Sequence, residues 1–202
     1  MLQARSGREI IETTRDDLVE FPDAVPESVR RFARTLIDRR CLATPLEIER
    51  LAVDAPALLT DLRRGVADFG DVEDVGAFTN WAARWVREFG ALVDAKALSL
   101  RMVHSRKPMC PRFHVDNVRV RLICALVGPG SEWLRSEDVS YLPDDRVCQQ
   151  VHPGAVQQLA SGSIGLFRGV RFRGGRKQGV VHRSPQTAVD RVVMTMDIVD
   201  DA

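Results

Sequence analysis

The sequence predicts an α+β fold in which N-terminal helices pack on an antiparallel β structure formed by the second half of the chain. Apolar residues recur at three- and four-residue steps before residue 97, the period of helices, and at two-residue steps after it, the period of strands. The chain has 202 residues, of which 45% are hydrophobic, enough for one domain with a real core. We therefore expect a single domain over residues 1–202, with a helical part at 1–96 and a β-rich part at 97–202.

Two helical segments are predicted before residue 70. Residues 26–40 carry four apolar residues on one helical stripe: Val29, Phe32, Leu36 and Ile37. Residues 44–69 follow, where Thr44 and Glu47 have the spacing of a capping box and Pro56 divides the segment.

The strongest helical pattern lies at residues 74–98. Its aromatic and apolar residues recur at three- and four-residue steps: Phe78, Trp81, Trp85, Phe89 and Leu92. Such a stripe is open to two interpretations, a cofactor box or a helix that packs one face on a sheet. We favour the packing helix.

Strand-like alternation begins at residue 97. Residues 97–104 alternate, and residues 115–127 then place one apolar set on a single face: Val118, Val120, Leu122 and Cys124. Glycines and a proline at 128–130 break the chain. Short segments follow at 137–142, 148–151, 162–169, 179–184 and 191–199, with glycine- and proline-bearing turns between them. This spacing predicts an antiparallel sandwich or a small barrel.

Composition and charge exclude several classes of function. A formal net charge of +1 gives no electrostatic footprint for nucleic acid. No apolar run approaches the roughly 18 residues of a membrane span, and the charged N-terminus does not resemble a signal peptide. The 4 cysteines form no C-x-x-C pair, so a zinc knuckle or a thioredoxin motif is not expected. We therefore expect a cytoplasmic protein with reduced thiols.

One short motif, His-Val-Asp at residues 114–116, carries the chemistry. Residues i and i+2 of a strand point the same way, so His114 and Asp116 can share one metal ion. Of the other histidines, His104, His152 and His182, the last is best placed, because hairpins can bring the final strands beside the first. Two histidines and one carboxylate leave coordination positions open, as in non-haem Fe(II) oxygenases. The alternative is a hydrogen-bonded His114–Asp116 pair at a strand entrance.

Arg191 is the candidate anchor for a co-substrate of such an iron. The keto acid end of 2-oxoglutarate chelates the metal, and its distal carboxylate suits the planar fork of an arginine. On residues 191–199, Arg191 shares a face with Thr195, whose hydroxyl is a candidate second donor. The alternative for Arg191 is a structural ion pair with Asp190 or Asp197.

The motif pattern resembles that of the Fe(II)/2-oxoglutarate-dependent oxygenases over about residues 97–200. It comprises His-x-Asp, a distant histidine and an arginine about ten residues later. The resemblance implies a double-stranded β-helix, a jelly-roll or cupin-like core. One departure is Val193, where those oxygenases often carry serine or threonine. The segments "CPRFHVDNVRVRLICALVGPGSEWL" and "GLFRG…GVVHRSP" are more closely similar to a bacterial family, domain of unknown function 1826, which brings no established activity.

Other polar residues are interpreted more simply. Asn117 and Arg121 lie on the strand parity opposite the triad, so they are poor candidates for direct contact with the metal unless the strand is bulged. His104 and Cys110 are assigned to an irregular loop, with the mouth of the site as the alternative. Cys148 and His152 are assigned to a turn, with a second metal site as the alternative. The basic residues Arg168, Arg171, Arg173, Arg176 and Lys177 predict a solvated hairpin tip or, alternatively, a basic lid.

Two functional hypotheses follow. The first is an Fe(II)/2-oxoglutarate-dependent oxygenase that hydroxylates a small-molecule or peptide substrate, with no nucleic-acid or membrane partner. The second is a non-catalytic, cupin-like protein that binds zinc or iron in metal homeostasis, because imidazole and carboxylate hold both ions. The sequence leaves the substrate and the oligomeric state open.

Overall fold

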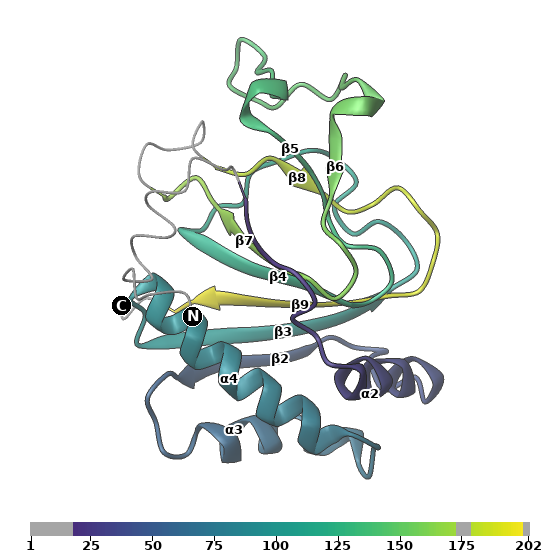
Figure 1. Cartoon of the computed structure of the whole chain (residues 1–202), viewed down its shortest axis with the longest axis vertical. Coiled ribbons are helices and arrows are strands. Elements are labelled where there is room, and N and C mark those ends of the chain that lie inside the picture. The colour runs from purple at the N-terminus through teal and green to yellow at the C-terminus, as the bar shows by residue number, and fades with distance from the viewer. Residues whose placement is uncertain (1–17, 173–178, 200–202) are drawn as a thin grey trace.

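Two antiparallel sheets form the framework of the protein (Figure 1). The computed structural model describes residues 18–172 and 179–199. Within them the larger sheet contains, in spatial order, β1 (Val19–Phe21), β7 (Ile164–Arg168), β4 (Val120–Val127), β9 (Arg191–Ile198), β3 (Ala97–Ser105) and β2 (Leu46–Ala52). The smaller sheet contains β6 (Val156–Gln158), β5 (Glu132–Leu134) and β8 (His182–Arg183).

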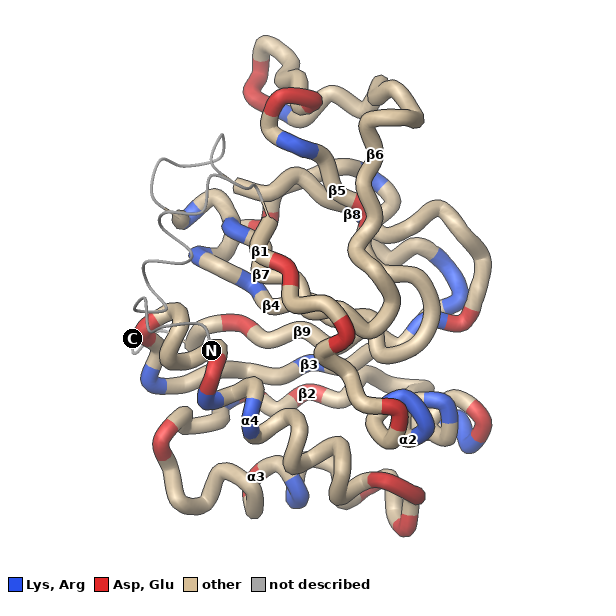
Figure 2. The backbone as a smooth tube through the Cα atoms, viewed as in Figure 1, with Lys and Arg blue, Asp and Glu red and all other residues tan. Residues whose placement is uncertain are grey.

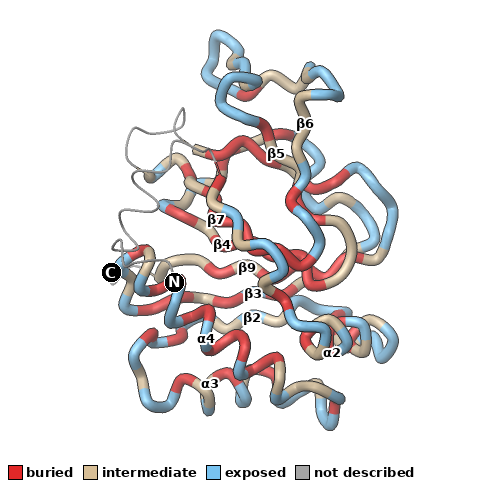
Figure 3. The backbone as a smooth tube through the Cα atoms, in the orientation of Figure 1, coloured by how far each residue is buried: buried red, intermediate tan, exposed pale blue. Residues whose placement is uncertain are grey.

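Three α-helices cover one face of the larger sheet: α2 (Glu27–Asp38), α3 (Leu58–Gly65) and α4 (Val75–Val93) (Figure 1). Their apolar stripes and the facing strands make the main core, the buried layer between helices and sheet in Figure 3. Phe32 of α2 stacks on Phe78 of α4 with ring centroids 4.6 Å apart. Burying one such ring contributes on the order of 1.5–3 kcal/mol. The expected packing of the 74–98 stripe in a core is thus confirmed.

The other face of the larger sheet looks toward the smaller sheet. Ile123, Phe167 and Val193 of the larger sheet form a second apolar cluster, which Trp133 of the smaller sheet joins. This cluster fills only part of the space between the sheets, and the remainder holds the polar site described below. The 3₁₀ helices, η1 (Ala67–Phe69), η2 (Ser136–Asp138) and η3 (Pro153–Ala155), lie in connections.

The helix predicted over the first part of residues 44–69 is wrong, because residues 46–52 form strand β2. Leu46 and Ile48 alternate with Glu47 and Glu49, and β2 pairs antiparallel with β3 through a register shift after Ile48. The capping-box spacing favours a helix here, but the backbone hydrogen bonds between β2 and β3 favour a strand. Without β2, the edge of β3 would have hydrogen-bonding groups without partners. The part of the segment after Pro56 does contain a helix, α3.

The short β segments were predicted with mixed success. Residues 162–169, 179–184 and 191–199 contain β7, β8 and β9. Residues 137–142 instead contain the end of η2 and one isolated bridge, Tyr141 to Val147, and residues 148–151 form no strand. Strands β5 and β6, of three residues each, were not predicted. Such short segments carry too few residues for a reliable period.

Figure 2 shows acidic and basic residues interspersed along the backbone, in keeping with the net charge of +1. Within residues 18–172 and 179–199, no helix has both the length and the apolar character needed to cross a bilayer.

Candidate metal centre

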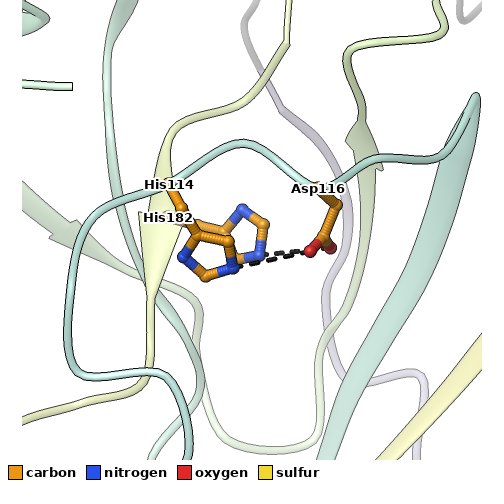
Figure 4. A group of neighbouring side chains, drawn as sticks. All are labelled: His114, Asp116 and His182. Atoms are coloured by element: carbon orange, nitrogen blue, oxygen red, sulfur yellow. Dashed lines mark ion pairs between the residues drawn. The ribbon is translucent and has the colours of Figure 1, made fainter. Parts of the chain in front are cut away.

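A β-bridge between His114, which lies outside the strands, and His182 of strand β8 brings the two histidines together. The backbone N–H of His114 donates to the carbonyl of His182 and the reverse bond also forms, both at 3.0 Å. The two imidazole rings therefore lie side by side, with centroids 4.6 Å apart. Asp116 follows two residues after His114 and turns its carboxylate toward both rings (Figure 4). The predicted convergence of the three side chains is confirmed, whereas their role as metal ligands stays a prediction.

The strand face predicted for the triad is wrong. Strand β4 begins only at Val120, and residues 115–119 form no strand. The apolar parity of β4, with Leu122 and Cys124, faces the helices and the main core. The opposite parity, with Arg121, lines the cavity that holds the triad. The irregular turn before β4 interrupts the two-residue alternation. Alternation extended from β4 back to His114 therefore places the triad on the wrong side of the sheet.

The spacing of the ligand atoms fits a divalent cation. The Asp116 Oδ1 lies 3.4 Å from His114 Nε2, and Oδ2 lies 3.4 Å from His182 Nε2 (Figure 4). One ligand atom from each residue lies within 4.8 Å of the others. Bonds of about 2.0–2.2 Å to a common ion place neighbouring ligand atoms about 3 Å apart. A small contraction of the present arrangement therefore suffices.

The second nitrogen of each imidazole is held by the backbone. His114 Nδ1 lies 2.9 Å from the carbonyl oxygen of Arg112, and His182 Nδ1 lies 3.0 Å from that of Val180. A carbonyl only accepts hydrogen bonds, so each Nδ1 carries the hydrogen. Each Nε2 is then the nitrogen that faces Asp116. Outer contacts of this kind fix the orientation of metal-ligating histidines.

The charges around Asp116 keep it ionised. Burial alone raises the pKa of this carboxyl, but hydrogen bonds from His114 and His182 and the charge of Arg121 outweigh burial and hold the pKa far below its usual range. The same contact with Asp116 raises the pKa of His114 above its usual value. The carboxylate thus favours the protonated form of His114.

Metal affinity is expected to fall as the pH is lowered. A ligating histidine must be neutral, and the raised pKa of His114 means that a proton competes with the metal up to a higher pH than at an ordinary histidine. Below that pKa the apparent affinity loses about tenfold per pH unit for one competing proton, and above it the affinity levels off. Zn²⁺ titrations between pH 5.5 and 8.5 measure this. A flat profile across that range contradicts the assignment of His114.

Arg121 and Asp197 line the site, although the predicted strand face turned Arg121 away from the triad. Its Nη1 donates to Asp116 Oδ2 at 2.9 Å. Its Nε and Nη2 donate to the two carboxylate oxygens of Asp197 at 2.7 and 2.8 Å. Asn117 stays exposed, where it accepts from Arg171. Alternate residues of β4, starting from Arg121, point toward the triad. They do so because residues 115–119 turn before the strand begins, and no sequence pattern predicts that turn.

Arg191 lies buried on the same face of β9 as Thr195, and both line the cavity. The Arg191 Nε donates to the carbonyl oxygen of Pro129 at 2.8 Å, and Nη2 donates to the hydroxyl of Ser131 at 3.1 Å. Among the described residues, no carboxylate forms an ion pair with Arg191, because Asp197 pairs with Arg121 and Asp190 with His104 and Arg106. The alternative of a structural ion pair is therefore wrong. Burial lowers the pKa of Arg191 to about 10, so the group stays protonated at neutral pH.

The cavity beside the triad has a volume of about 150 Å³. Arg191 and Ser131 lie on its wall together with the triad, and Cys110 also lines it, so the loop assigned to Cys110 borders the site. Ser131 was missed because it follows the 128–130 break, where no period marks the direction of a side chain.

The remaining sequence-based assignments have varied outcomes. His104 lies in strand β3, not in a loop, while His152 accepts a hydrogen bond from the backbone of Gly154 at the start of η3, as expected of a turn. Of the basic segment, Arg173, Arg176 and Lys177 lie outside the described residues.

Solved structures of oxygenases share this fold. A Pseudomonas putida prolyl-4-hydroxylase matches with a TM-score of 0.50 and 11% identity, covering 97% of this chain and 95% of that chain. Dioxygenase for auxin oxidation 1 from Arabidopsis thaliana, in its 2-oxoglutarate binary complex, matches with a TM-score of 0.57 and 9% identity over 100% and 91% of the two chains. The dioxygenase for auxin oxidation of rice matches with a TM-score of 0.55 and 15% identity over 96% and 77%. At these identities the likeness shows the fold: helices with antiparallel sheets, as in the jelly roll of 2-oxoglutarate oxygenases.

Sequence comparison gives the family. No curated protein matches the sequence. A family model described as "Protein of unknown function (DUF1826)" matches residues 11–197. Because this match includes nearly the whole chain, with the His-x-Asp motif and the distal histidine, the protein belongs to the DUF1826 family.

Proposed function

We propose that this protein is an Fe(II)- and 2-oxoglutarate-dependent oxygenase that hydroxylates a small-molecule or peptide substrate. One observation carries the proposal: two imidazoles and one carboxylate converge on a cavity whose wall also holds a buried arginine without a carboxylate partner among the described residues. The first three supply an iron site with open positions. The arginine supplies a counter-charge for a co-substrate acid.

The triad residues would hold the iron and leave the cavity side of its coordination sphere open. Iron and 2-oxoglutarate, when bound, supply the oxidising chemistry with O₂, and the protein supplies orientation and exclusion of water. The backbone contacts of both Nδ1 atoms hold the imidazoles in place, and Asp116 contributes the negative charge. His182 is buried, and this limits access of water from its side.

Arg191 would bind the distal carboxylate of 2-oxoglutarate, and Thr195 would donate a second hydrogen bond. The carbonyl of Pro129 and the hydroxyl of Ser131 occupy Nε and Nη2 of Arg191, which sets the plane of the guanidinium. A buried cation without a counter-charge is costly, and an incoming carboxylate offsets that cost. Val193 carries no hydroxyl, and Ser131, which accepts from Arg191, would offer one on the same cavity wall.

We also propose that the whole chain works as one unit on a double-stranded β-helix, with the helices as its support. Strands β1 and β2 from the first 96 residues add to the two edges of the sheet that carries Arg191. The helices fill the far side of that sheet. The net charge of +1 favours a small-molecule or peptide substrate over nucleic acid.

Anaerobic reconstitution tests this proposal. Protein loaded with Fe(II) is expected to develop a weak visible absorption band when 2-oxoglutarate is added, because the keto acid chelates the iron through the open positions. The band should not form with glutarate, which has both carboxylates but no keto group. Tight Zn²⁺ binding without any band on the iron-loaded protein would instead favour the non-catalytic metal-binding function.

A further inference from the structure

We propose that Arg121, held in place by Asp197, is a positioning residue that fixes the carboxylate of Asp116 for the metal. This inference rests on the proposed metal site and adds to it the device that orients its one acidic ligand. Arg121, Asp116 and Asp197 form a continuous chain of hydrogen bonds, each of 2.7–2.9 Å, across one wall of the cavity.

Asp116 needs such a device because its own segment does not provide one. Residues 115–119 belong to no strand, so no ladder fixes the direction of the side chain. The carbonyl of Asp116 accepts a bond from the N–H of Val170 at 2.8 Å, which anchors the backbone only. The terminal torsion of an aspartate has a broad, roughly two-fold preference, so the carboxylate takes its orientation from its hydrogen-bond partners.

Arg121 is suited to this role by its place in the sheet. It lies in β4, which pairs with β7 on one side and β9 on the other, and its direct cross-strand partner on β9 is Asp197. One edge of the guanidinium, Nε and Nη2, is occupied by Asp197, and only Nη1 reaches Asp116. The planar fork thus engages Oδ2 of Asp116 and leaves Oδ1 facing His114. A lysine, a single point donor, cannot bridge two carboxylates at fixed angles.

Asp197 has a distinct part in this arrangement. Without it, the freed edge of Arg121 could turn to Asp116 and take both of its oxygens in a bidentate pair, which is the preferred geometry of arginine with a carboxylate. The carboxylate would then be occupied by Arg121 instead of by the metal. Asp197 therefore acts on the metal site only through Arg121, and this dependence can be measured.

Co²⁺ titration of four proteins tests the inference: the wild type, Arg121→Ala, Asp197→Ala and the double variant. Visible spectra report both the affinity and the coordination of the ion. We expect each single variant to bind Co²⁺ about 10- to 100-fold more weakly, the usual cost of losing an outer-shell partner, with an altered spectrum. The double variant should bind as Arg121→Ala does, because Asp197 has no effect once Arg121 is gone. Arg121→Lys should not restore the wild-type affinity or spectrum.

Arg101→Ala is the matched control. Arg101 lines the same cavity but pairs with Glu47 and does not contact the triad, so its removal should leave Co²⁺ affinity unchanged. If Arg121→Ala unfolds, Asp197→Asn and Arg121→Lys carry the test, since the first keeps the shape of the side chain and the second keeps its positive charge. The positioning role is overturned if the Arg121 variants keep the wild-type Co²⁺ affinity and spectrum. It is also overturned if the affinity losses of the two single variants multiply in the double variant. Failure of the wild type itself to bind Co²⁺ would overturn the metal site as well, so the two failures are distinct.

Discussion

The Asp116→Ala variant is expected to lose iron and all turnover. Within residues 18–172 and 179–199, Asp116 is the only anionic group that pairs with both imidazoles, at 3.4 Å from each Nε2. Its removal leaves two neutral ligands beside the positive charge of Arg121, which repels a divalent cation. We expect the affinity for Fe(II) to fall by more than about 100-fold, beyond the cost of losing an outer-shell partner. Metal content after gel filtration and 2-oxoglutarate consumption measure both losses.

Two further variants make the result specific. Asp116→Asn keeps the shape of the side chain but not its charge, and it should show nearly the same loss. Asp190→Ala removes a carboxylate that also contacts a histidine, His104 at 2.8 Å, but lies outside the triad, so it should retain iron. If Asp116→Ala kept iron and activity while its fold, judged by circular dichroism, was unchanged, the metal would have to bind elsewhere.

The sequence predicted the elements whose period is long enough to count. The helices at 27–38 and 75–93 and the strands β3, β4 and β9 each show several repeats of their period. Strand β2 was missed for a physical reason: its alternation is interrupted by the register shift between Ile48 and Leu51, and its conformation depends on pairing with β3. The local sequence pattern cannot predict a strand conformation that depends on pairing with a strand distant in the sequence.

The candidate site was predicted by residue type and missed in its orientation. His114, Asp116 and His182 were found because only a few side chains offer that chemistry at that spacing. The face of β4 was inverted, because the turn at 115–119 changes the parity before the strand begins. Arg121 was consequently assigned away from the metal, although it contacts Asp116 directly. Ser131 could be found only from the folded position of its loop beside Arg191.

Replacing Arg191 with glutamine is expected to weaken 2-oxoglutarate binding without loss of metal. A hydrogen-bonded contact between charged groups contributes about 1.5–3 kcal/mol, so the KM for 2-oxoglutarate should rise roughly 10- to 150-fold. Thr195→Val removes one neutral hydroxyl of similar shape and should raise that KM only about fivefold. Co²⁺ affinity should be the same in both variants and in the wild type, because neither side chain belongs to the triad.

The thermal stability of the Arg191→Gln protein shows whether Arg191 serves as a co-substrate anchor or as a structural residue. Arg191 is 8% exposed and has no carboxylate partner among the described residues, so its charge is a cost to the folded protein without co-substrate. Glutamine removes that charge and can still donate to the carbonyl of Pro129. The thermal unfolding midpoint without 2-oxoglutarate should therefore stay constant or rise, and the stabilisation that added 2-oxoglutarate gives the metal-loaded wild type should disappear. A lower midpoint together with unchanged 2-oxoglutarate binding would mean that Arg191 serves the fold, and the co-substrate would then have to be held by another cation of the cavity.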